Sequence, residues 1–278
     1  MSLIEELDGY RSKTIPTRKT EKFLGLVTTF IISDINSSSS TAGMRKVVKS
    51  IKDTKSLMDP FIMPATTPET LEEDLKLFGM SKSDWTYPLA GESRIDIKSG
   101  LHLTGYNAKN IDKVMSCLVS HMRCWLVATA GRMPIIVLEH DALIKRTFNP
   151  YGTPVRDSKE LLKYGIIGLN SPKGATRNWS TYMQGVLDQS KAVKNTFGEY
   201  QVVDAPWVDS NEYVPQGLAG NSAYLITPNV ARNLLGLVEK YGLWPNDALM
   251  CKQLLSYQLK QIYPFVSELQ GISSTTQG

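Results

Sequence analysis

The order of apolar segments along the chain constrains its fold more than any other feature of the sequence. Residues 23–33, FLGLVTTFIIS, are apolar and rich in β-branched side chains, which predicts a buried strand. A helix is expected from about Thr41, because residues 42–58 place apolar side chains on one face and lysines on the other. Residues 60–65 and 67–80 repeat this succession of strand and helix. Such an order predicts an α/β fold with a mostly parallel central sheet flanked by helices.

The rest of the chain predicts further strands and helices and two long irregular segments. Strands are expected at 135–144, 200–208 and 222–228, and helices at 110–132, 229–242 and 248–260. The helix at 67–80 should hold Pro68 and Glu69 in its first turn. Residues 87–110 read as a loop, and residues 149–200 are rich in Gly, Asn, Lys and Thr. We expect this second segment to be partly mobile and functional, since compact domains seldom keep long irregular segments otherwise.

Length and composition indicate an ordinary globular protein. The 278 residues are 42% hydrophobic, which is enough for one substantial core. No secretory signal opens the chain, and no apolar run approaches the roughly 20 residues of a membrane span. Three cysteines are too few for a disulfide framework and favour a reducing compartment. We therefore expect a soluble, cytoplasmic protein without membrane insertion.

Positive charge gathers near the N-terminus. Residues 1–22 are expected to form a basic arm ahead of a single domain at 23–278, and five of the cations lie within 11–22. Such an arm is either solvated or in contact with phosphates, for example those of a nucleic acid. The net charge of +4 permits a polyanionic partner without requiring one.

Acidic residues follow the predicted strands at the points where the strands end. Glu139, His140 and Asp141 come directly after a run of apolar residues, and Asp34 follows the first strand. Carboxylates at such positions are costly to desolvate unless a metal ion, a basic side chain or solvent neutralises them. Because the carboxyl ends of parallel strands share one rim, Mg²⁺ or Mn²⁺ on a substrate diphosphate would neutralise both sites. Pairing with the nearby cations at 145–146 is the alternative.

Two further groups of residues have more than one interpretation. Cys117, His121 and Cys124 lie on one face of the predicted helix and could be zinc ligands. A structural zinc site, however, usually has four ligands, and no fourth lies nearby in the sequence. Two buried thiols and a hydrogen-bonded core histidine are therefore the preferred interpretation. Asp247, in WPNDALM, either caps the helix that follows, with Asn246, or serves as a catalytic carboxylate.

Three stretches resemble one known family. SCLVSHMRCWLVATAGRMPIIVLEHDALI resembles the central signature of glycosyltransferase family 25, the lipooligosaccharide-type glycosyltransferases. GLAGNSAYLITPNVARNLL is similar to a later stretch of that family, and WPNDALM to its Pro-x-Asp element. The three keep the family's order and cover roughly residues 112 to 250. TFIISDINSSSSTAGMRK is similar to the family's opening strand, with Arg45 as the basic residue after it.

The resemblance implies an enzyme that transfers a sugar from a nucleoside diphosphate, with a GT-A-type Rossmann-like fold and a uridine-diphosphate sugar as the expected donor. It implies Mn²⁺ or Mg²⁺ on Asp141, with Glu139 as the acidic partner. His140 stands where the family usually has Asp, which changes the number of direct ligands that the motif supplies. The residues expected at the nucleotide sugar are Ser33, Asp34, Arg45, His121, Glu139 and His140.

The implied mechanism also needs a base. If the transfer inverts the anomeric carbon, a carboxylate must take the proton of the acceptor hydroxyl from the face opposite the leaving group. Asp247 is the first candidate, ahead of Asp204 and Asp209.

The acceptor rests on a second resemblance. The sequence is similar to divergent family members of tailed bacteriophages, some of which glycosylate hydroxymethylated cytosine in their own DNA, in the cytoplasm of the infected host. Duplex DNA with hydroxymethylated bases is the expected partner, and no protein partner is implied. Lipopolysaccharide, another glycan and protein remain alternative acceptors, and an inactive nucleic-acid-binding module is the alternative to an enzyme. Cations and aromatic side chains at 149–200 would hold the DNA: Lys163, Lys173, Arg177, Lys191 and Lys194, with Tyr151, Tyr164, Trp179 and Tyr182.

Overall fold

The computed structural model describes residues 25–106, 108–150, 162–174, 178–193, 196–197 and 199–271. The predicted arm at 1–22 lies outside them. A central sheet runs through this part of the chain in the order β2-β1-β5-β10-β7-β11-β9-β8. Its strands are β1 (Val27–Ser33), β2 (Met58–Pro64), β5 (Ile135–Glu139), β7 (Ile166–Gly168), β8 (Thr196–Phe197), β9 (Tyr200–Asp204), β10 (Ala223–Ile226) and β11 (Leu259–Tyr263).

The strand directions confirm the predicted α/β class. β1 pairs in parallel with β2 and with β5, and β11 pairs in parallel with β7. β10 runs against both of its neighbours, β5 and β7, and β9 runs against β11 and β8. All the strands except β10 and β9 therefore point the same way, so their carboxyl ends share one edge of the sheet.

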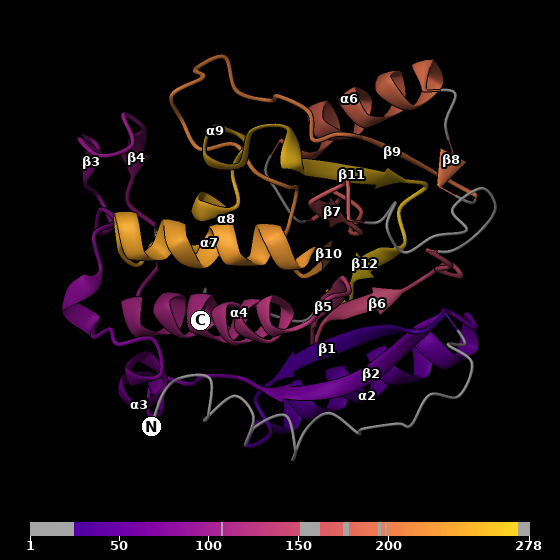
Figure 1. Cartoon of the computed structure of the whole chain (residues 1–278), viewed down its shortest axis with the longest axis horizontal. Coiled ribbons are helices and arrows are strands. Elements are labelled where there is room, and N and C mark those ends of the chain that lie inside the picture. The colour runs from indigo at the N-terminus through magenta and orange to yellow at the C-terminus, as the bar shows by residue number, and fades with distance from the viewer. Residues whose placement is uncertain are drawn as a thin grey trace.

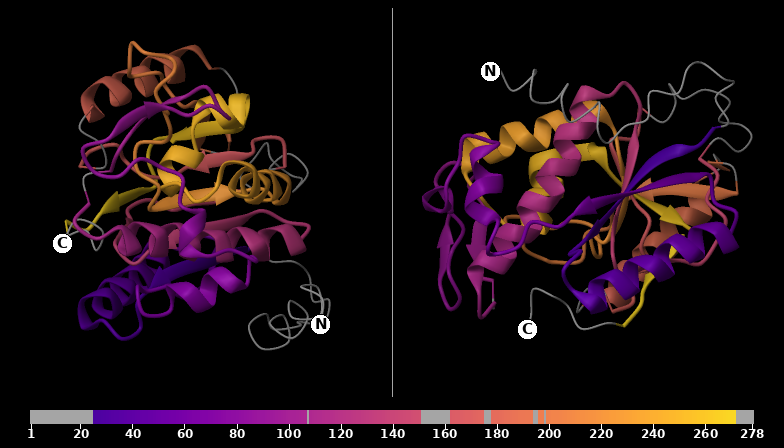
Figure 2. Two further views of the ribbon diagram at one scale, coloured as in Figure 1. Left: turned by 90° about the vertical axis from the view of Figure 1, so that its left-hand side faces the viewer. Right: turned by 90° about the horizontal axis from the view of Figure 1, so that it is seen from below.

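Helices cover both faces of this sheet (Figures 1 and 2). α2 (Ser38–Asp53) lies on one face, while α4 (Ile111–Ala130) and α7 (Pro228–Tyr241) lie side by side on the other. α6 (Trp179–Ala192) packs against β9 and β11 at the far end of the sheet. None of the helices in the described ranges combines the length and the apolar character that a membrane span needs.

Side chains alternate between the two faces, as the period of two in a strand requires. Phe30 and Ile32 of β1 belong to the core beneath α4 and α7, whereas Ile31 belongs to the core beneath α2. In β10, Tyr224 points toward α4 and Leu225 toward α2. The sheet is thus buried on both sides, which explains why its strands read as continuous apolar runs.

Short elements surround the sheet. The segment expected to be a loop at 87–110 contains a hairpin of β3 (Ser93–Ile95) and β4 (His102–Thr104), which projects at the left of Figure 1. β6 (Ala142–Ile144) pairs with β12 (Ser267–Leu269) in a separate two-stranded sheet. The remaining helices are α3 (Leu71–Lys76), α8 (Asn246–Leu249), α9 (Lys252–Leu255) and two 3₁₀ turns at Lys82–Asp84 and Ser256–Gln258.

Several predicted boundaries were wrong. The long helix at 248–260 is replaced by α8, α9, a 3₁₀ turn and the start of β11, because β11 pairs with β7 and β9, strands remote in sequence. The strand at 135–144 breaks after Glu139, and a separate strand begins at Ala142. Pro68 and Glu69 precede α3 instead of forming its first turn. The segment at 149–200 contains β7 and α6 in its described part.

Gly242 ends α7 in a conformation that only glycine adopts easily. Its φ is +91°, and a Cβ atom there would lie 2.6 Å from the Asp84 carbonyl oxygen. We expect Gly242→Ala to lower the free energy of unfolding by more than about 2 kcal/mol, through backbone strain and this clash. Gly236, in the interior of α7, has open space around it, so Gly236→Ala should stabilise by about 0.5–1 kcal/mol. Urea unfolding of both variants checks this, and similar effects at both glycines would contradict it.

Candidate active site

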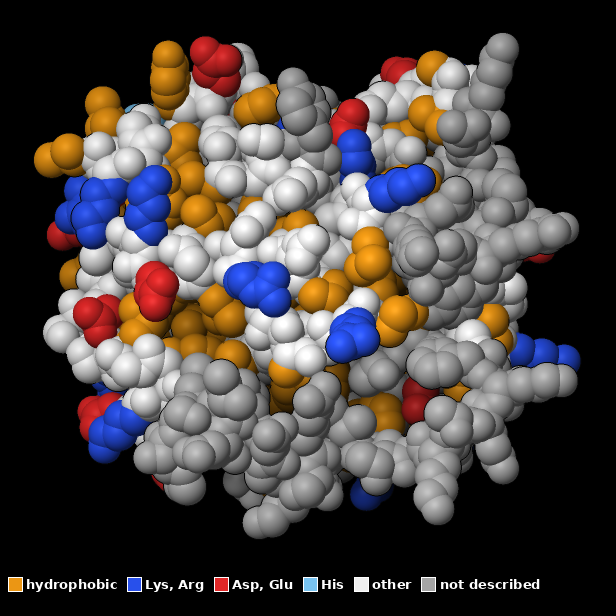
Figure 3. Space-filling model, viewed as in Figure 1, with side chains coloured by type: hydrophobic (Ala, Val, Ile, Leu, Met, Phe, Trp, Pro, Cys, Tyr) orange, Lys and Arg blue, Asp and Glu red, His pale blue; other side chains and the backbone are white. Residues whose placement is uncertain are grey.

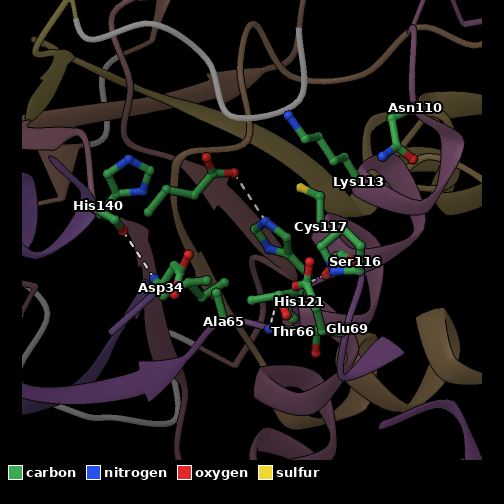
Figure 4. Close-up of a pocket in the computed structure, with 16 residues that line it drawn as sticks. Asp34, Ala65, Thr66, Glu69, Asn110, Lys113, Ser116, Cys117, His121 and His140 are labelled. Carbon is green, nitrogen blue, oxygen red and sulfur yellow. Dashed lines mark hydrogen bonds and ion pairs between the residues drawn. The ribbon is translucent and has the colours of Figure 1, made fainter. Parts of the chain in front are cut away.

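A pocket opens where the carboxyl ends of β1, β2 and β5 meet α4. Its volume is about 430 Å³. The residues after β1 and β2 form one side, including Asp34, Thr66 and Glu69. The first half of α4 forms the other side and contributes Cys117 and His121, which point into the pocket (Figure 4). The end of β5 completes the wall with Glu139 and His140.

Glu139 faces α4 because of its place in β5. Ile135 and Val137 lie in the core on the α4 side, so the alternation of the strand turns Glu139 to that side as well. There its Oε1 atom lies 3.1 Å from Nε2 of His121, whose Nδ1 atom lies 2.8 Å from the hydroxyl of Tyr224. Burial disfavours the charged form of Glu139, but the hydrogen bond from His121 outweighs it and holds the pKa of this carboxyl below its ordinary value.

Asp141 lies in the turn between β5 and β6, is half-buried and, unlike Glu139 and His140, is not among the residues that line the pocket. Its Oδ1 atom has no hydrogen-bond partner among the described residues. Burial and the charge of Glu139 raise the pKa of Asp141 from 3.8 to about 7. The turn is held from the C-terminal end of the chain, because the backbone N–H of Gln270 donates to the Asp141 carbonyl oxygen at 2.9 Å. Its side-chain amide donates to the His140 carbonyl oxygen at 3.2 Å.

The end of β1 is organised by Ser40 of α2. Its hydroxyl lies 3.1 Å from that of Ser33 and accepts a hydrogen bond from the Asp34 backbone N–H at 3.0 Å. Asp34 and Ser40 line the pocket. For Asp34 this was predicted from its position directly after the first strand. Arg45, by contrast, is exposed on α2 and is not a lining residue of this pocket.

His140 also lines the pocket, on the side of Asp34. Burial lowers the pKa of its imidazole, and the charges of Glu139 and Asp34 oppose this shift only in part. A neutral imidazole at this position adds no positive charge beside the carboxylates.

The candidate zinc residues are only partly brought together. Cys117 and His121 join Glu139, and the ligand atoms of these three residues lie within 4.8 Å of one another. Cys124 is instead fully buried in the core beneath α4, as the preferred interpretation of this group predicted. Cys117 differs from that interpretation because it lines the pocket, where burial raises the pKa of its thiol.

Asp247 lies close enough to Glu139 for the two charges to interact. Burial raises the pKa of Asp247, the Glu139 charge adds to the shift, and the backbone N–H groups of Ala248 and Asp247 oppose it. The hydroxyl of Tyr106 lies 3.5 Å from its Oδ2 atom. α8 has Pro245 at its N-cap and only four residues, so Asp247 does not begin the long helix that was expected.

The two other candidates for the base, Asp204 and Asp209, do not line the pocket. Asp204 pairs with Lys260 at the start of β11, which places it at the edge of the sheet opposite to Glu139. Asp209 is exposed in the loop after β9.

Sequence analysis missed several residues at this site. Tyr224 and Tyr106 are brought to His121 and Asp247 across more than 100 positions of the chain. Tyr224 lies in the stretch GLAGNSAYLITPNVARNLL that resembles the family, but nothing in that stretch pointed to its contact with His121. Asn110 and Lys113 line the pocket from the beginning of α4. Lys113 lies four residues before Cys117 on the same helix, and Asn110 is the N-cap three residues before Lys113; this spacing is the one signal that pointed to them.

The pair of carboxylates fits a divalent cation. Asp141 presents a buried oxygen without a partner, and Glu139 has a second oxygen beyond the one bonded to His121. Mg²⁺ and Mn²⁺ prefer such hard oxygen ligands and complete their coordination with water and substrate phosphate.

The model of glycosyltransferase family 25 (LPS biosynthesis protein) matches residues 64–250, more than half of the chain. Two solved structures are also similar. The bifunctional glycosyltransferase WbbM, in its apo structure, covers 87% of this chain at 10% identity with a TM-score of 0.35. Mouse xyloside xylosyltransferase 1, apo form, covers 84% at 10% identity with a TM-score of 0.31. The chain spans 39% of the length of the former and 83% of the latter. No curated protein matches it.

The sequence match defines the class of the protein. The chain belongs to glycosyltransferase family 25, which confirms the family inferred from its motifs.

The raised pKa of Asp141 predicts how stability depends on pH without metal. Its folded-state pKa lies above the unfolded value, so its favourable contribution is complete below about pH 4 and is lost as the pH rises through about 7. Asp141→Asn should remove this loss of stability, because the amide stays neutral at every pH. We expect its stabilising effect to grow with pH up to about 7, by at most about 1.4 kcal/mol per pH unit, and then to level off.

Thermal unfolding from acid to neutral pH checks this, with Asp188→Asn as the control. Asp188 is exposed on α6, and hydrogen bonds from Gln184 and Lys191 lower the pKa of its carboxyl. Its replacement should therefore give no gain at neutral pH. A pH-independent effect of Asp141→Asn would contradict the prediction.

Proposed function

We propose that the chain transfers a sugar from a nucleoside-diphosphate donor, with uridine diphosphate as the expected nucleotide, in a reaction that requires Mn²⁺ or Mg²⁺. The observation that carries this proposal is the unpartnered buried oxygen of Asp141, whose carboxyl group lies close enough to Glu139 for the two charges to interact. Glu139 lines the pocket formed by the strand ends, whereas Asp141 follows it in the next turn and is not a lining residue. Ligands of open α/β sheets bind at such rims. A bound divalent ion would supply Lewis-acid stabilisation of the leaving diphosphate.

The residues of the pocket suit the remaining tasks of donor binding. Hydroxyl and amide groups of Ser40, Thr66 and Asn110 offer hydrogen-bond partners to a nucleoside, and Lys113 contributes positive charge. The carboxylates of Glu139 and Asp141 would bind the ion. The reaction then depends on a base that reaches the acceptor hydroxyl.

Asp247 is our candidate for this base. Its burial and the nearby charge of Glu139 raise its pKa, which makes the carboxylate a better proton acceptor than an exposed one. Tyr106 would orient it through the hydroxyl 3.5 Å from Oδ2.

Hydroxymethylated cytosine in duplex DNA stays our prediction for the acceptor. Support comes from the net charge of +4 and from Trp179, which is 40% exposed at the start of α6. Tyr182 is buried with its hydroxyl on Gln261, so it is not free to stack on a base. Arg177, Lys194 and Tyr151 lie outside the described residues. On the face in Figure 3 the described Lys and Arg side chains lie in separate small groups.

The first experiment measures transfer from labelled uridine-diphosphate sugars, with and without Mn²⁺, to paired duplexes containing cytosine or hydroxymethylcytosine. We expect metal-dependent label on the hydroxymethylated duplex alone, and a loss of more than about 100-fold in Glu139→Gln or Asp141→Asn, since each removes a charge that holds the ion. Asp188→Asn should leave transfer unchanged. Label that persists in a chelator would contradict the metal requirement, and donor hydrolysis without label on DNA would redirect the search for the acceptor to glycans.

Replacement of the proposed base separates chemistry from donor binding. We expect Asp247→Asn to reduce kcat by about 100-fold or more while the KM for the donor changes little, because the carboxylate acts on the acceptor hydroxyl. Steady-state kinetics at saturating acceptor measure both constants. Full turnover of this variant would remove Asp247 from the role.

A further inference from the structure

Four side chains form a buried hydrogen-bonded chain that ends at the pocket. The indole nitrogen of Trp125 lies 2.9 Å from the hydroxyl of Tyr224, and that hydroxyl lies 2.8 Å from Nδ1 of His121. Nε2 of His121 lies 3.1 Å from Oε1 of Glu139. Trp125 and Tyr224 are completely buried, and His121 is 1% exposed. Glu139 is therefore the one member that water reaches appreciably.

The chemistry of these groups fixes the direction of the chain. An indole N–H can only donate, so the oxygen of Tyr224 accepts from Trp125. The hydroxyl hydrogen of Tyr224 is then free to point at Nδ1 of His121, the second atom within hydrogen-bond distance. The carboxylate of Glu139 can only accept, so the proton of the neutral imidazole is on Nε2 and is donated to Glu139. Nδ1 is then unprotonated and accepts the hydrogen bond from the Tyr224 hydroxyl.

We propose that Trp125 and Tyr224 are positioning residues, which keep the proton of His121 on Nε2 so that this N–H orients Glu139 at the pocket. This inference deepens the function proposed above and rests on it for the role of Glu139. With Oε1 occupied by His121, the second oxygen of Glu139 is the one left to the ion. Partners of this kind behind a metal ligand change affinity or activity by about 10–100-fold when they are removed.

The same geometry offers a competing arrangement. A soft ion such as Zn²⁺ would bind the thiolate of Cys117, the imidazole of His121 and a carboxylate oxygen of Glu139, whose ligand atoms lie within 4.8 Å of one another. That ion would occupy the position that we assign to the Nε2 proton. The two arrangements therefore exclude each other, and an experiment on His121 separates them.

The first measurement is the tautomer of His121, read by two-bond ¹⁵N–¹H correlation at about pH 8 on the full chain without added metal. We expect a proton on Nε2 and none on Nδ1. A proton on Nδ1 alone, or on both nitrogens, would overturn the proposal. So would a thiolate-to-cobalt absorption band on addition of Co²⁺ that is lost in Cys117→Ser, because it would put a metal between the three residues.

The second measurement is the Mn²⁺ concentration that gives half-maximal turnover of the donor. We expect Tyr224→Phe to raise it about tenfold. Tyr182→Phe is the matched control, because Tyr182 is another buried tyrosine whose hydroxyl, 3.2 Å from Gln261, lies outside the pocket. The control should change the Mn²⁺ requirement by less than about twofold, because the Tyr182 hydroxyl does not contact His121 or Glu139. Equal effects of the two variants would reduce Tyr224 to a structural role and overturn the proposal.

A conservative replacement tests the donated proton itself. His121→Leu removes the donor to Glu139 and should raise the Mn²⁺ requirement by up to about 100-fold, whereas the amide of His121→Gln supplies an N–H and should recover about tenfold of the loss. A glutamine variant as impaired as the leucine variant would overturn the proposal. If the wild-type protein shows no Mn²⁺-dependent turnover, the proposed function fails, and the tautomer of His121 still decides the inference.

Discussion

The hydrogen bond between His121 and Glu139 joins the central helix to the central strand at the mouth of the pocket. Each partner reaches this point through a simple periodicity. Alternation along β5 turns Glu139 toward α4, and the helical repeat of α4 places His121 one turn after Cys117. In β5 the residues 135–138 are buried, and Glu139 at the end of the strand is the one that solvent reaches. The pocket is therefore a direct consequence of the layered fold.

Charge within the pocket is distributed differently from charge over the whole chain. The chain has an excess of cations, yet the charge of Glu139, which lines the pocket, interacts with those of Asp141 and Asp247. Burial raises the pKa of Asp141 and of Asp247, and the charge of Glu139 adds to both shifts. A divalent cation would neutralise the carboxylates, and a substrate diphosphate would in turn be neutralised by the cation. Binding of either partner should thus favour binding of the other.

Sequence reasoning succeeded where the local pattern and the tertiary environment agree. β1, α2, α4, β10 and α7 all have the periodicity of their final structure, and Glu139 and Asp34 were placed at the rim by the rule that parallel strands end together. It failed at 248–260, where an apparently helical stretch contributes β11 to a sheet whose pairing no short window reveals. Tyr224 was hidden for the same reason, since its partners on α4 lie about 100 positions away.

The turn that carries Asp141 is held by Gln270 and by the pairing of β6 with β12, both supplied by the C-terminal end of the described chain. The family match, by contrast, ends at residue 250 and begins at residue 64. A fragment cut at these limits would retain β5, β10 and β7 but lose β1 and β11, so that β9 and β8 would be separated from the sheet. The stretch that matches the family is thus not a unit of folding. The turn with Asp141 lies within the matched residues, but its shape depends on Gln270 and β12, which lie outside them.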